Sequence, residues 1–260
     1  ANIWGCNAPA GTTTSLVNEQ RQVSWNGGPF PCFNQFNTLA DNLDRNGVSW
    51  RYYAVAIGTG GDGWSSFDAI RRVRNGRDWK NVISPPVRVL TQAAAGLPGV
   101  TWVTPDVQDS DHTGNNSSTG PSWVASVVNA IGKSPDWDST AIVVLWDDWG
   151  GWYDNAAPPQ KDFVGLGERV PCLIISPYAR ENYVSHTTYE FGSVLKLAEE
   201  IFGLGQIGPS FFGYTDTRAN SMEDAFDFAQ APRRFVPIPA PKEPSFFMTR
   251  KGSNEPPDRD

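Results

Sequence analysis

Two neighbouring carboxylates follow the most apolar run of the sequence. Residues 141–146 (AIVVLW) lead directly into Asp147 and Asp148, and Gly150 and Gly151 follow within the stretch WDDWGGWYD. Adjacent carboxylates in a partly buried place repel each other unless a cation compensates, and hard divalent cations accept carboxylate oxygens as ligands. The pair is therefore a candidate metal site. The alternative is a turn-forming Asp pair, followed by glycines that serve the backbone geometry alone.

A histidine follows a second strand-like run. Residues 100–104 (VTWVT) precede the stretch DVQDSDH, which ends in Asp111 and His112. Because ligands bind beyond the carboxyl ends of the strands in open α/β sheets, this stretch and the two aspartates are expected to share one crevice. A histidine there binds a metal or exchanges a proton with an anionic substrate, and Asp111 beside it would orient the ring. The alternative is a surface histidine in a loop rich in Gly, Asn and Ser.

Two further residues are candidates for substrate binding. His186 stands just ahead of a predicted long helix, whose N-terminus offers N–H groups and a positive dipole end to a phosphate. An ordinary residue of the capping region is the alternative. Trp149 belongs to an aromatic group that is expected to form both core and pocket wall, namely Trp146, Trp149, Trp152 and Tyr153.

Helix-like and strand-like patterns alternate along residues 36–202, which predicts an α/β domain with a mostly parallel sheet flanked by helices. Helices are predicted over 36–46, 67–75, 87–95, 121–132 and 189–202, the last with Thr187 or Thr188 as its N-cap. Strands are predicted over 48–57, 100–104, 141–146 and 169–176, and the continuous apolar run 141–146 is typical of a central parallel strand.

The regions outside this pattern differ in composition. Residues 1–35 are predicted to be loop-rich, the α/β domain covers 36–215, and the Pro-rich and then charged tail 216–260 is expected to wrap the surface or to be disordered. The 260 residues hold no run of about 20 apolar residues, which excludes an integral membrane helix. A formal net charge of −7 argues against binding to nucleic acid or anionic lipid.

The three cysteines bear on the cellular compartment. Cys6 and Cys32 lie in segments rich in Gly, Pro and Asn, where a disulfide would close a loop, and whether they pair is left open. Such a bridge would imply an oxidising compartment, hence a periplasmic or secreted protein. Cys172 lies in the apolar run 170–175 and is expected to be a buried free thiol.

Four segments, taken together and in order, resemble a known family. They are WVTPDVQDSDH, PSWVASVVNAIGKSPDWDSTAIVVLWDDWGGWYD, RVPCLIISPYAR and HTTYEFGSVLKLAEEIFGL. They are similar to the bacterial phosphoesterase family of non-haemolytic phospholipases C and acid phosphatases, over about Trp4 to Phe235. The resemblance implies an alkaline-phosphatase-like fold. It also implies that Asp147 and Asp148 hold one divalent metal ion and that His112 lies in the phosphate pocket.

The resemblance further implies metal-dependent hydrolysis of phosphate esters through a phospho-enzyme, acting on a small phosphate ester or a phospholipid head group. His112 would stabilise the transferring group or protonate the leaving alkoxide. All-oxygen ligands suit Mg, Ca or Mn, and an added histidine would admit Zn or Fe, so the metal stays open. The alternatives are a non-catalytic module that binds phosphate or phosphocholine, and a hydrolase of another ester such as a sulfate or phosphonate.

Two features of the family's pattern differ in this sequence. Asn155 stands where relatives often carry a histidine, and neither the N-terminal E-N-R-S-F motif nor the nucleophile segment is found. The sequence is therefore expected to be the C-terminal half of such an enzyme, able to associate with the missing N-terminal half. A sheet edge and an apolar surface would then be uncovered.

Overall fold

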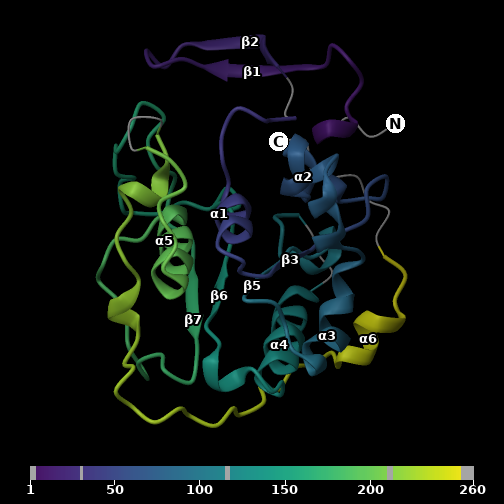
Figure 1. Ribbon diagram of the computed structural model, residues 1–260, viewed down its shortest axis with the longest axis vertical. Helices are drawn as coiled ribbons and strands as arrows, with labels where there is room; N and C mark the ends of the chain where they lie inside the picture. Colours follow the sequence, from purple (N-terminus) through teal and green to yellow (C-terminus); the bar gives the residue numbers. More distant parts are fainter. Residues whose placement is uncertain (1–3, 30–31, 115–117, 210–212, 253–260) are drawn as a thin grey trace.

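The computed structural model describes residues 4–29, 32–114, 118–209 and 213–252, whose strands form three separate sheets (Figure 1). The strands are β1 (Thr13–Val17), β2 (Val23–Pro29), β3 (Trp50–Tyr53), β4 (Val82–Ile83), β5 (Val100–Val103), β6 (Ile142–Leu145) and β7 (Cys172–Ile175). The α-helices are α1 (Leu39–Arg45), α2 (Arg71–Arg74), α3 (Val89–Gln92), α4 (Gly120–Gly132), α5 (Phe191–Phe202) and α6 (Pro244–Thr249).

The central sheet is parallel, with strand order β4–β3–β5. Side chains alternate between the two faces of β3, so Trp50 and Tyr52 point to one face and Tyr53 to the other. Trp50 and Tyr52 pack in one cluster with residues of α1 and α2, whereas Tyr53 packs in a second cluster with residues of α3, α4 and α6. Helices therefore cover both faces of this sheet, which confirms an α/β arrangement with a parallel sheet.

The sheet does not continue through β6 as the sequence pattern predicts. β6 pairs antiparallel with β7 in a two-stranded sheet of its own, so the prediction of a central parallel strand over 141–146 is wrong for this chain. A parallel neighbour needs a crossover connection, usually a helix. Residues 146–171, which join the two strands, contain no helix, and the chain returns antiparallel.

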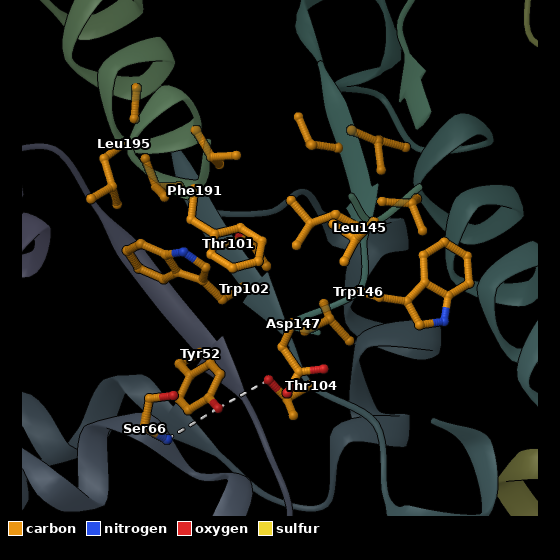
Figure 2. A pocket seen from close by; sticks show the side chains of 18 of the residues that line it. Tyr52, Ser66, Thr101, Trp102, Thr104, Leu145, Trp146, Asp147, Phe191 and Leu195 are labelled. Atoms are coloured by element: carbon orange, nitrogen blue, oxygen red, sulfur yellow. Dashed lines mark hydrogen bonds between the residues drawn. The ribbon is translucent and has the colours of Figure 1, made fainter. Parts of the chain in front are cut away.

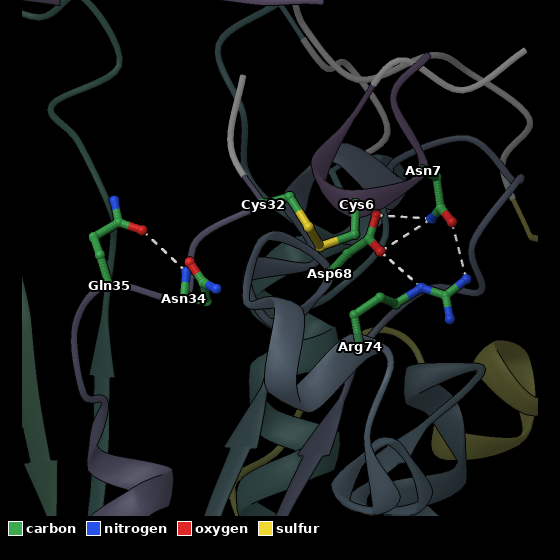
Figure 3. Close-up of a disulfide and its surroundings, with 7 residues drawn as sticks. All are labelled: Cys6, Asn7, Cys32, Asn34, Gln35, Asp68 and Arg74. Carbon is green, nitrogen blue, oxygen red and sulfur yellow. Dashed lines mark hydrogen bonds and ion pairs between the residues drawn. A yellow bond between two sulfur atoms is a disulfide. The ribbon is translucent and has the colours of Figure 1, made fainter. Parts of the chain in front are cut away.

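The N-terminal segment is tied to the body of the molecule by a disulfide. Cys6 and Cys32 are bonded (Figure 3), and the hairpin of β1 and β2 lies between them in the sequence. Beside the disulfide, the Asn7 amide donates to both carboxylate oxygens of buried Asp68, at 3.0 and 2.9 Å, and Arg74 donates to the same carboxylate at 2.9 Å. Residues 1–35 therefore contain ordered structure as well as loops.

The described part of the tail packs against α4. Asn129 exchanges two hydrogen bonds of 2.8 Å with the backbone of Ile238, and the Trp137 indole donates to the Arg233 carbonyl at 2.8 Å. Phe247 of α6 is buried among α3 and α4 side chains. Within the described residues, no helix combines the length and the apolar character that crossing a membrane requires.

Cys172 is a free cysteine as expected, but the prediction that it is buried is wrong. It opens β7, which is an edge strand of a two-stranded sheet, and its neighbour Leu173 is exposed as well. An apolar strand is covered on both faces when it lies inside a sheet flanked by helices. β7 instead lies at the edge of a two-stranded sheet.

A buried pair of carboxyl groups joins α5 to the segment after it. Glu199 and Asp216 are 6% and 1% exposed, and the Ile207 N–H donates to Asp216 at 3.1 Å. Burial, with the nearby charge of Asp216 as the second cause, raises the pKa of Glu199 to about 7. In the unfolded chain, Glu199 has its ordinary pKa near 4.5 and loses its proton at a lower pH than in the folded protein.

We therefore expect the free energy of unfolding to fall as the pH rises from about 4.5 to about 7, because the folded state holds more protons over this window. The change should be about 2 kcal/mol between pH 5 and pH 8, and Glu199→Gln should flatten it. Urea unfolding at the two pH values measures it, with Glu200→Gln, an exposed neighbour on α5, as the matched control. If the free energy of unfolding of Glu199→Gln falls with pH as steeply as that of the unmodified protein, Glu199 is not the group responsible.

Candidate functional site

A cavity of about 2290 Å³ lies between β5 and β6. Figure 2 shows Trp102 and Thr104 on its β5 side, Asp147 after the end of β6, and Phe191 and Leu195 of α5. Five of the six residues predicted to form the site line this cavity, and they are Asp111, His112, Asp147, Asp148 and Trp149. The structure thus brings together two stretches that the sequence separates.

The aspartate pair, Asp147 and Asp148, is exposed on a tight turn. The Gly150 N–H donates to the Asp148 carboxylate at 2.6 Å. Gly150 and Gly151 have positive φ angles of 62° and 75°, which favour glycine. Turn geometry therefore accounts for part of this motif. The donors suit a hard divalent cation, but the described residues place no third Asp, Glu, His or Cys with them, and such cations take six or more oxygens.

His112 is held in one orientation by two neighbours. Its Nδ1 lies 2.7 Å from the Thr113 carbonyl oxygen, and its ring stacks on Trp64 with 5.9 Å between centroids and 21° between planes. A carbonyl can only accept, so this contact assigns the proton to Nδ1.

Asp111 lies against the start of α4. Its backbone has φ +60°, and a Cβ at Gly120 would come within 2.2 Å of the Asp111 Oδ1. Glycine at position 120 therefore permits the carboxylate to approach the helix N-terminus, where a negative charge is favoured. The His112 ring contacts Trp64 and Thr113, and the expectation that Asp111 also orients it stays a prediction.

The two loops that carry these residues are bonded to each other. The Thr113 hydroxyl donates to the Gly150 carbonyl, so residues 111–113 and 147–151 are held together. A Cβ at Gly150 would lie 2.6 Å from the Thr113 Oγ1, which is a second reason for glycine there. Thr113 was not predicted as a site residue, since a threonine in a loop carries no signal of a partner 37 positions away.

Comparison with known proteins identifies the family of the chain. A family model described as the phosphoesterase family matches residues 2–205. The chain belongs to the phosphoesterase family. Its similarity to curated proteins includes phospholipase C B of Mycobacterium tuberculosis, with 28% identity over 76% of this chain and 44% of the relative. It also includes non-hemolytic phospholipase C of Pseudomonas aeruginosa, with 25% identity over 87% of the chain and 38% of the relative.

A plant protein, non-specific phospholipase C6 of Arabidopsis thaliana, is 25% identical over 79% of the chain and 44% of its own length. The phosphoesterase chain therefore spans less than half of the length of each of these relatives.

The loop that carries His112 in this phosphoesterase is anchored from a distant helix. Arg250, at the end of α6, donates to Asp109 at 2.6 Å and to Asp106 at 3.3 Å. Asp109 is 6% exposed and also accepts from the Thr119 hydroxyl at 2.7 Å. Burial raises the pKa of Asp109. Arg250 lies 141 positions from Asp109, and nothing in the sequence pattern points to this pair.

A second ion pair closes the loop that follows the aspartate pair. Arg169 donates to both carboxylate oxygens of Asp154, at 2.7 Å each. These hydrogen bonds hold the pKa of Asp154 well below its usual range. Both residues line the cavity, but the Asp154 carboxylate is engaged by Arg169 and is not placed with Asp147.

His186 is not brought to the site. It is exposed, it does not line the cavity, and α5 begins at Phe191 with Glu190 as its N-cap, so the predicted cap at Thr187 or Thr188 is wrong. The reason is a competing acceptor, because Asp224 accepts hydrogen bonds from Tyr183, Ser185, Thr187 and Tyr189. These bonds hold the segment around His186 outside the helix.

The four aromatics after β6 do not form a core. Trp149 is 44% exposed, and Trp152 and Tyr153 are more exposed still. All four line the cavity, as expected for a pocket wall. The expectation that they also form a buried core is wrong. The residues lie on an open loop, which leaves their rings accessible to solvent.

The bond between the loops predicts the result of a conservative substitution. Thr113→Val keeps the shape of the side chain and removes its hydroxyl, so the His112 loop should separate from the aspartate pair. We expect catalytic efficiency to fall by roughly tenfold, in keeping with the loss of one hydrogen bond, with little change in stability. Steady-state kinetics of the native-source protein measures it. The control is Thr91→Val, which removes an exposed hydroxyl of α3 that is bonded to the Arg88 carbonyl. This variant should leave the catalytic efficiency unchanged.

Proposed function

We propose that this chain supplies one side of the active site of a metal-dependent phosphate-ester hydrolase of the phospholipase C or phosphatase type. The observation that carries the proposal is the convergence of the aspartate pair and His112 on one cavity, with their loops joined through Thr113 and Gly150. The relatives are phospholipases C, which supports a phospholipid head group as the substrate, and a small phosphate ester has the same reacting group.

Each residue has a role in this proposal. Asp147 and Asp148 hold one divalent cation, which when bound would neutralise charge on the phosphoryl oxygens and activate a hydroxyl nucleophile. His112, whose Nδ1 bonds the Thr113 carbonyl, would stabilise the transferring group or protonate the leaving alkoxide. Trp149 and Asp111 border the substrate. His186 does not line this cavity, and a part for it in binding the substrate stays a prediction.

The proposal places the nucleophile and the remaining metal ligands outside these 260 residues. Two carboxylates do not complete a hard-metal site, and the chain spans less than half of its relatives. The reaction would proceed through a phospho-enzyme on an alkaline-phosphatase-like fold. The Cys6–Cys32 disulfide supports an oxidising compartment, and we propose a periplasmic or secreted location.

Removal of the metal tests the function. The protein isolated from the cells that produce it should hydrolyse p-nitrophenyl phosphate or phosphatidylcholine, lose at least 90% of this activity, about tenfold, in EDTA, and regain it with added Mg²⁺, Ca²⁺, Mn²⁺ or Zn²⁺. Full activity in EDTA would contradict the metal role. Saturable phosphocholine binding without turnover would instead establish a binding module, and hydrolysis of sulfate esters alone would establish another ester specificity.

A further inference from the structure

One face of the His112 ring is covered by the indole of Trp64, to which the proposed function gives no role. The two rings lie nearly parallel, with 5.9 Å between their centroids, a distance typical of stacked aromatic pairs. We infer that Trp64 is a positioning residue for His112, and that the disulfide-bonded N-terminal segment, residues 4–7, holds Trp64 in place. The effect on turnover rests on the proposed function, whereas the contact between the rings does not.

The backbone of Trp64 is fixed from the central sheet. Trp64 ends the 3₁₀ turn Asp62–Trp64, and the hydroxyl of Tyr52 on β3 donates to the Trp64 carbonyl at 3.0 Å. The same hydroxyl lies 3.0 Å from the Oγ1 of Thr104, which follows β5 (Figure 2). Because Thr104 begins the stretch that leads to His112, the buried Tyr52 side chain ties both partners of the stacked pair to the sheet.

The turn that carries Trp64 also packs on the loop that carries His112. Gly61, just before the turn, has φ +82°, and a Cβ at this position would lie 3.4 Å from the Val107 Cγ2. Asp62 is buried, and its carboxylate accepts from the Gly58 N–H at 2.7 Å, which closes the loop ahead of the turn. The two stacked rings therefore belong to loops that contact each other a second time.

The N-terminal segment is bonded to residues 65–68, which follow the turn directly. The Trp4 indole N–H donates to the Ser65 carbonyl at 3.2 Å. Gly5 lies so close to Asp68 that a Cβ on the glycine would come within 2.8 Å of the Asp68 carbonyl carbon and oxygen. These contacts, together with the hydrogen bonds from the Asn7 amide to the Asp68 carboxylate, fix the position at which the chain leaves the turn (Figure 3).

The disulfide holds this segment in place by joining it to a second stretch of chain. Cys6 lies within the N-terminal segment, and its partner Cys32 directly precedes Phe33. The Phe33 N–H donates to the Ala69 carbonyl at 2.6 Å, and the Arg71 N–H donates to the Phe33 carbonyl at 2.9 Å. Both cross-linked stretches are thus bonded to the residues that follow the turn, and the cross-link prevents either stretch from leaving alone.

The arrangement orients the His112 ring more closely than a cavity wall requires. Trp64 lines the cavity, but it also lies within 21° of parallel to the imidazole and so fixes the plane of that ring. The contact of Nδ1 with the Thr113 carbonyl oxygen, at 2.7 Å, fixes the rotation of the ring within its plane. Holding a reacting group in one orientation lowers the entropic part of the barrier.

NMR of the native-source protein tests the contact without any need for turnover. The ring current of the Trp64 indole displaces the ring signals of His112 from those of the exposed His186. Trp64→Leu should move the His112 signals toward those of His186, whereas Trp64→Phe, which keeps an aromatic ring, should leave them displaced. In the same proteins, Trp64→Leu should lower kcat by roughly tenfold with KM unchanged, and Trp64→Phe should keep most of the rate.

Two further variants test the hold of the N-terminal segment. Trp4→Phe removes the indole N–H that donates to Ser65, and the double variant Cys6→Ser with Cys32→Ser removes the cross-link. Both should move the His112 signals in the same direction as Trp64→Leu. The matched control is Trp137→Phe, which removes an indole N–H bonded to a carbonyl at 2.8 Å away from the cavity, and it should leave the signals and kcat unchanged.

Three results separate this inference from the proposed function. His112 signals that stay in place in Trp64→Leu would overturn the positioning role of Trp64. A displacement in Trp64→Leu that is absent from both N-terminal variants would overturn the hold by residues 4–7. A displacement in Trp64→Leu with an unchanged kcat would confirm that Trp64 positions the ring and would contradict the part that the proposed function gives to His112.

Discussion

Under the proposed function, Asp147→Asn is expected to lower kcat/KM for phosphate-ester hydrolysis by roughly 10³-fold in the native-source protein, because a metal ion that polarises a phosphoryl group would contribute several kcal/mol to the transition state. The amide keeps the shape of the carboxylate and loses its charge. Asp147 is exposed and lies after the end of β6, so the free energy of unfolding should stay unchanged. Steady-state kinetics at saturating metal, together with urea unfolding, measures both quantities.

Asp138→Asn is the matched control for this substitution. Asp138 is an exposed aspartate in the 3₁₀ turn before β6, and it does not line the cavity. The variant carries the same change of charge at the opposite end of β6, away from the cavity lining, so its activity should equal that of the unmodified protein. Retention of activity by Asp147→Asn would remove the aspartate pair from the mechanism.

Arg250→Met destabilises the chain by roughly 3–5 kcal/mol, the usual cost of removing one partner from a buried ion pair. The substitution keeps an apolar stem beside Phe246 and Phe247, and it leaves buried Asp109 with a hydroxyl as its remaining partner in place of a cation. Because an unpaired buried carboxylate takes up a proton more readily, the loss should be larger at pH 8 than at pH 5.

Two controls test whether the loss of stability in Arg250→Met comes from the ion pair with Asp109. Arg234→Met removes an exposed arginine of the same tail and should change the stability by less than about 0.5 kcal/mol. The double variant Arg250→Met with Asp109→Asn should be more stable than Arg250→Met alone, since the uncompensated charge is gone. A loss below about 1 kcal/mol in Arg250→Met would mean that α6 does not anchor the His112 loop.

The helices and the parallel sheet follow from local pattern. The predicted helices 36–46, 121–132 and 189–202 correspond to α1, α4 and α5 within a few residues. In each case one apolar face repeats with the helical period. This face packs against the core in α1 and α4, whereas in α5 its end residues Phe191 and Ile201 are 52% and 53% exposed. The strands β3 and β5 follow from a different pattern. Their aromatic and β-branched residues fit a sheet that is covered on both faces.

The pairing of β6 was not predictable from its own residues. An apolar run of this kind fits a central parallel strand, and its neighbours are decided by distant parts of the chain. The connection 146–171 forms no helix and so returns β7 antiparallel. The edge of β6 toward β5 is left facing a cavity, and the exposed Cys172 on β7 follows from the same narrow sheet.

The candidate site residues that belong to short sequence motifs could be predicted. Asp147 and Asp148 stand directly after the apolar run 141–146, and His112 ends the short loop that follows the run 100–104, which is why their place at one cavity could be expected. Thr113, Asp109 and Arg250 could not be found in this way, because each acts through a partner far along the sequence. The N-cap predicted at Thr187 or Thr188 is wrong, since the Thr187 hydroxyl bonds Asp224 and the helix begins after Glu190, which leaves His186 away from the helix N-terminus.

The central claim is that a divalent metal binds at the aspartate pair beside His112. The sequence has two histidines, so their ring signals in an NMR spectrum form an internal comparison. Mn²⁺ added to the native-source protein should broaden the ring signals of His112, which shares the cavity with Asp147 and Asp148, and leave those of His186 sharp. In Asp147→Asn the broadening of His112 should disappear. Equal sharpness of both rings with Mn²⁺, or broadening of His112 that persists in Asp147→Asn, would contradict the metal site.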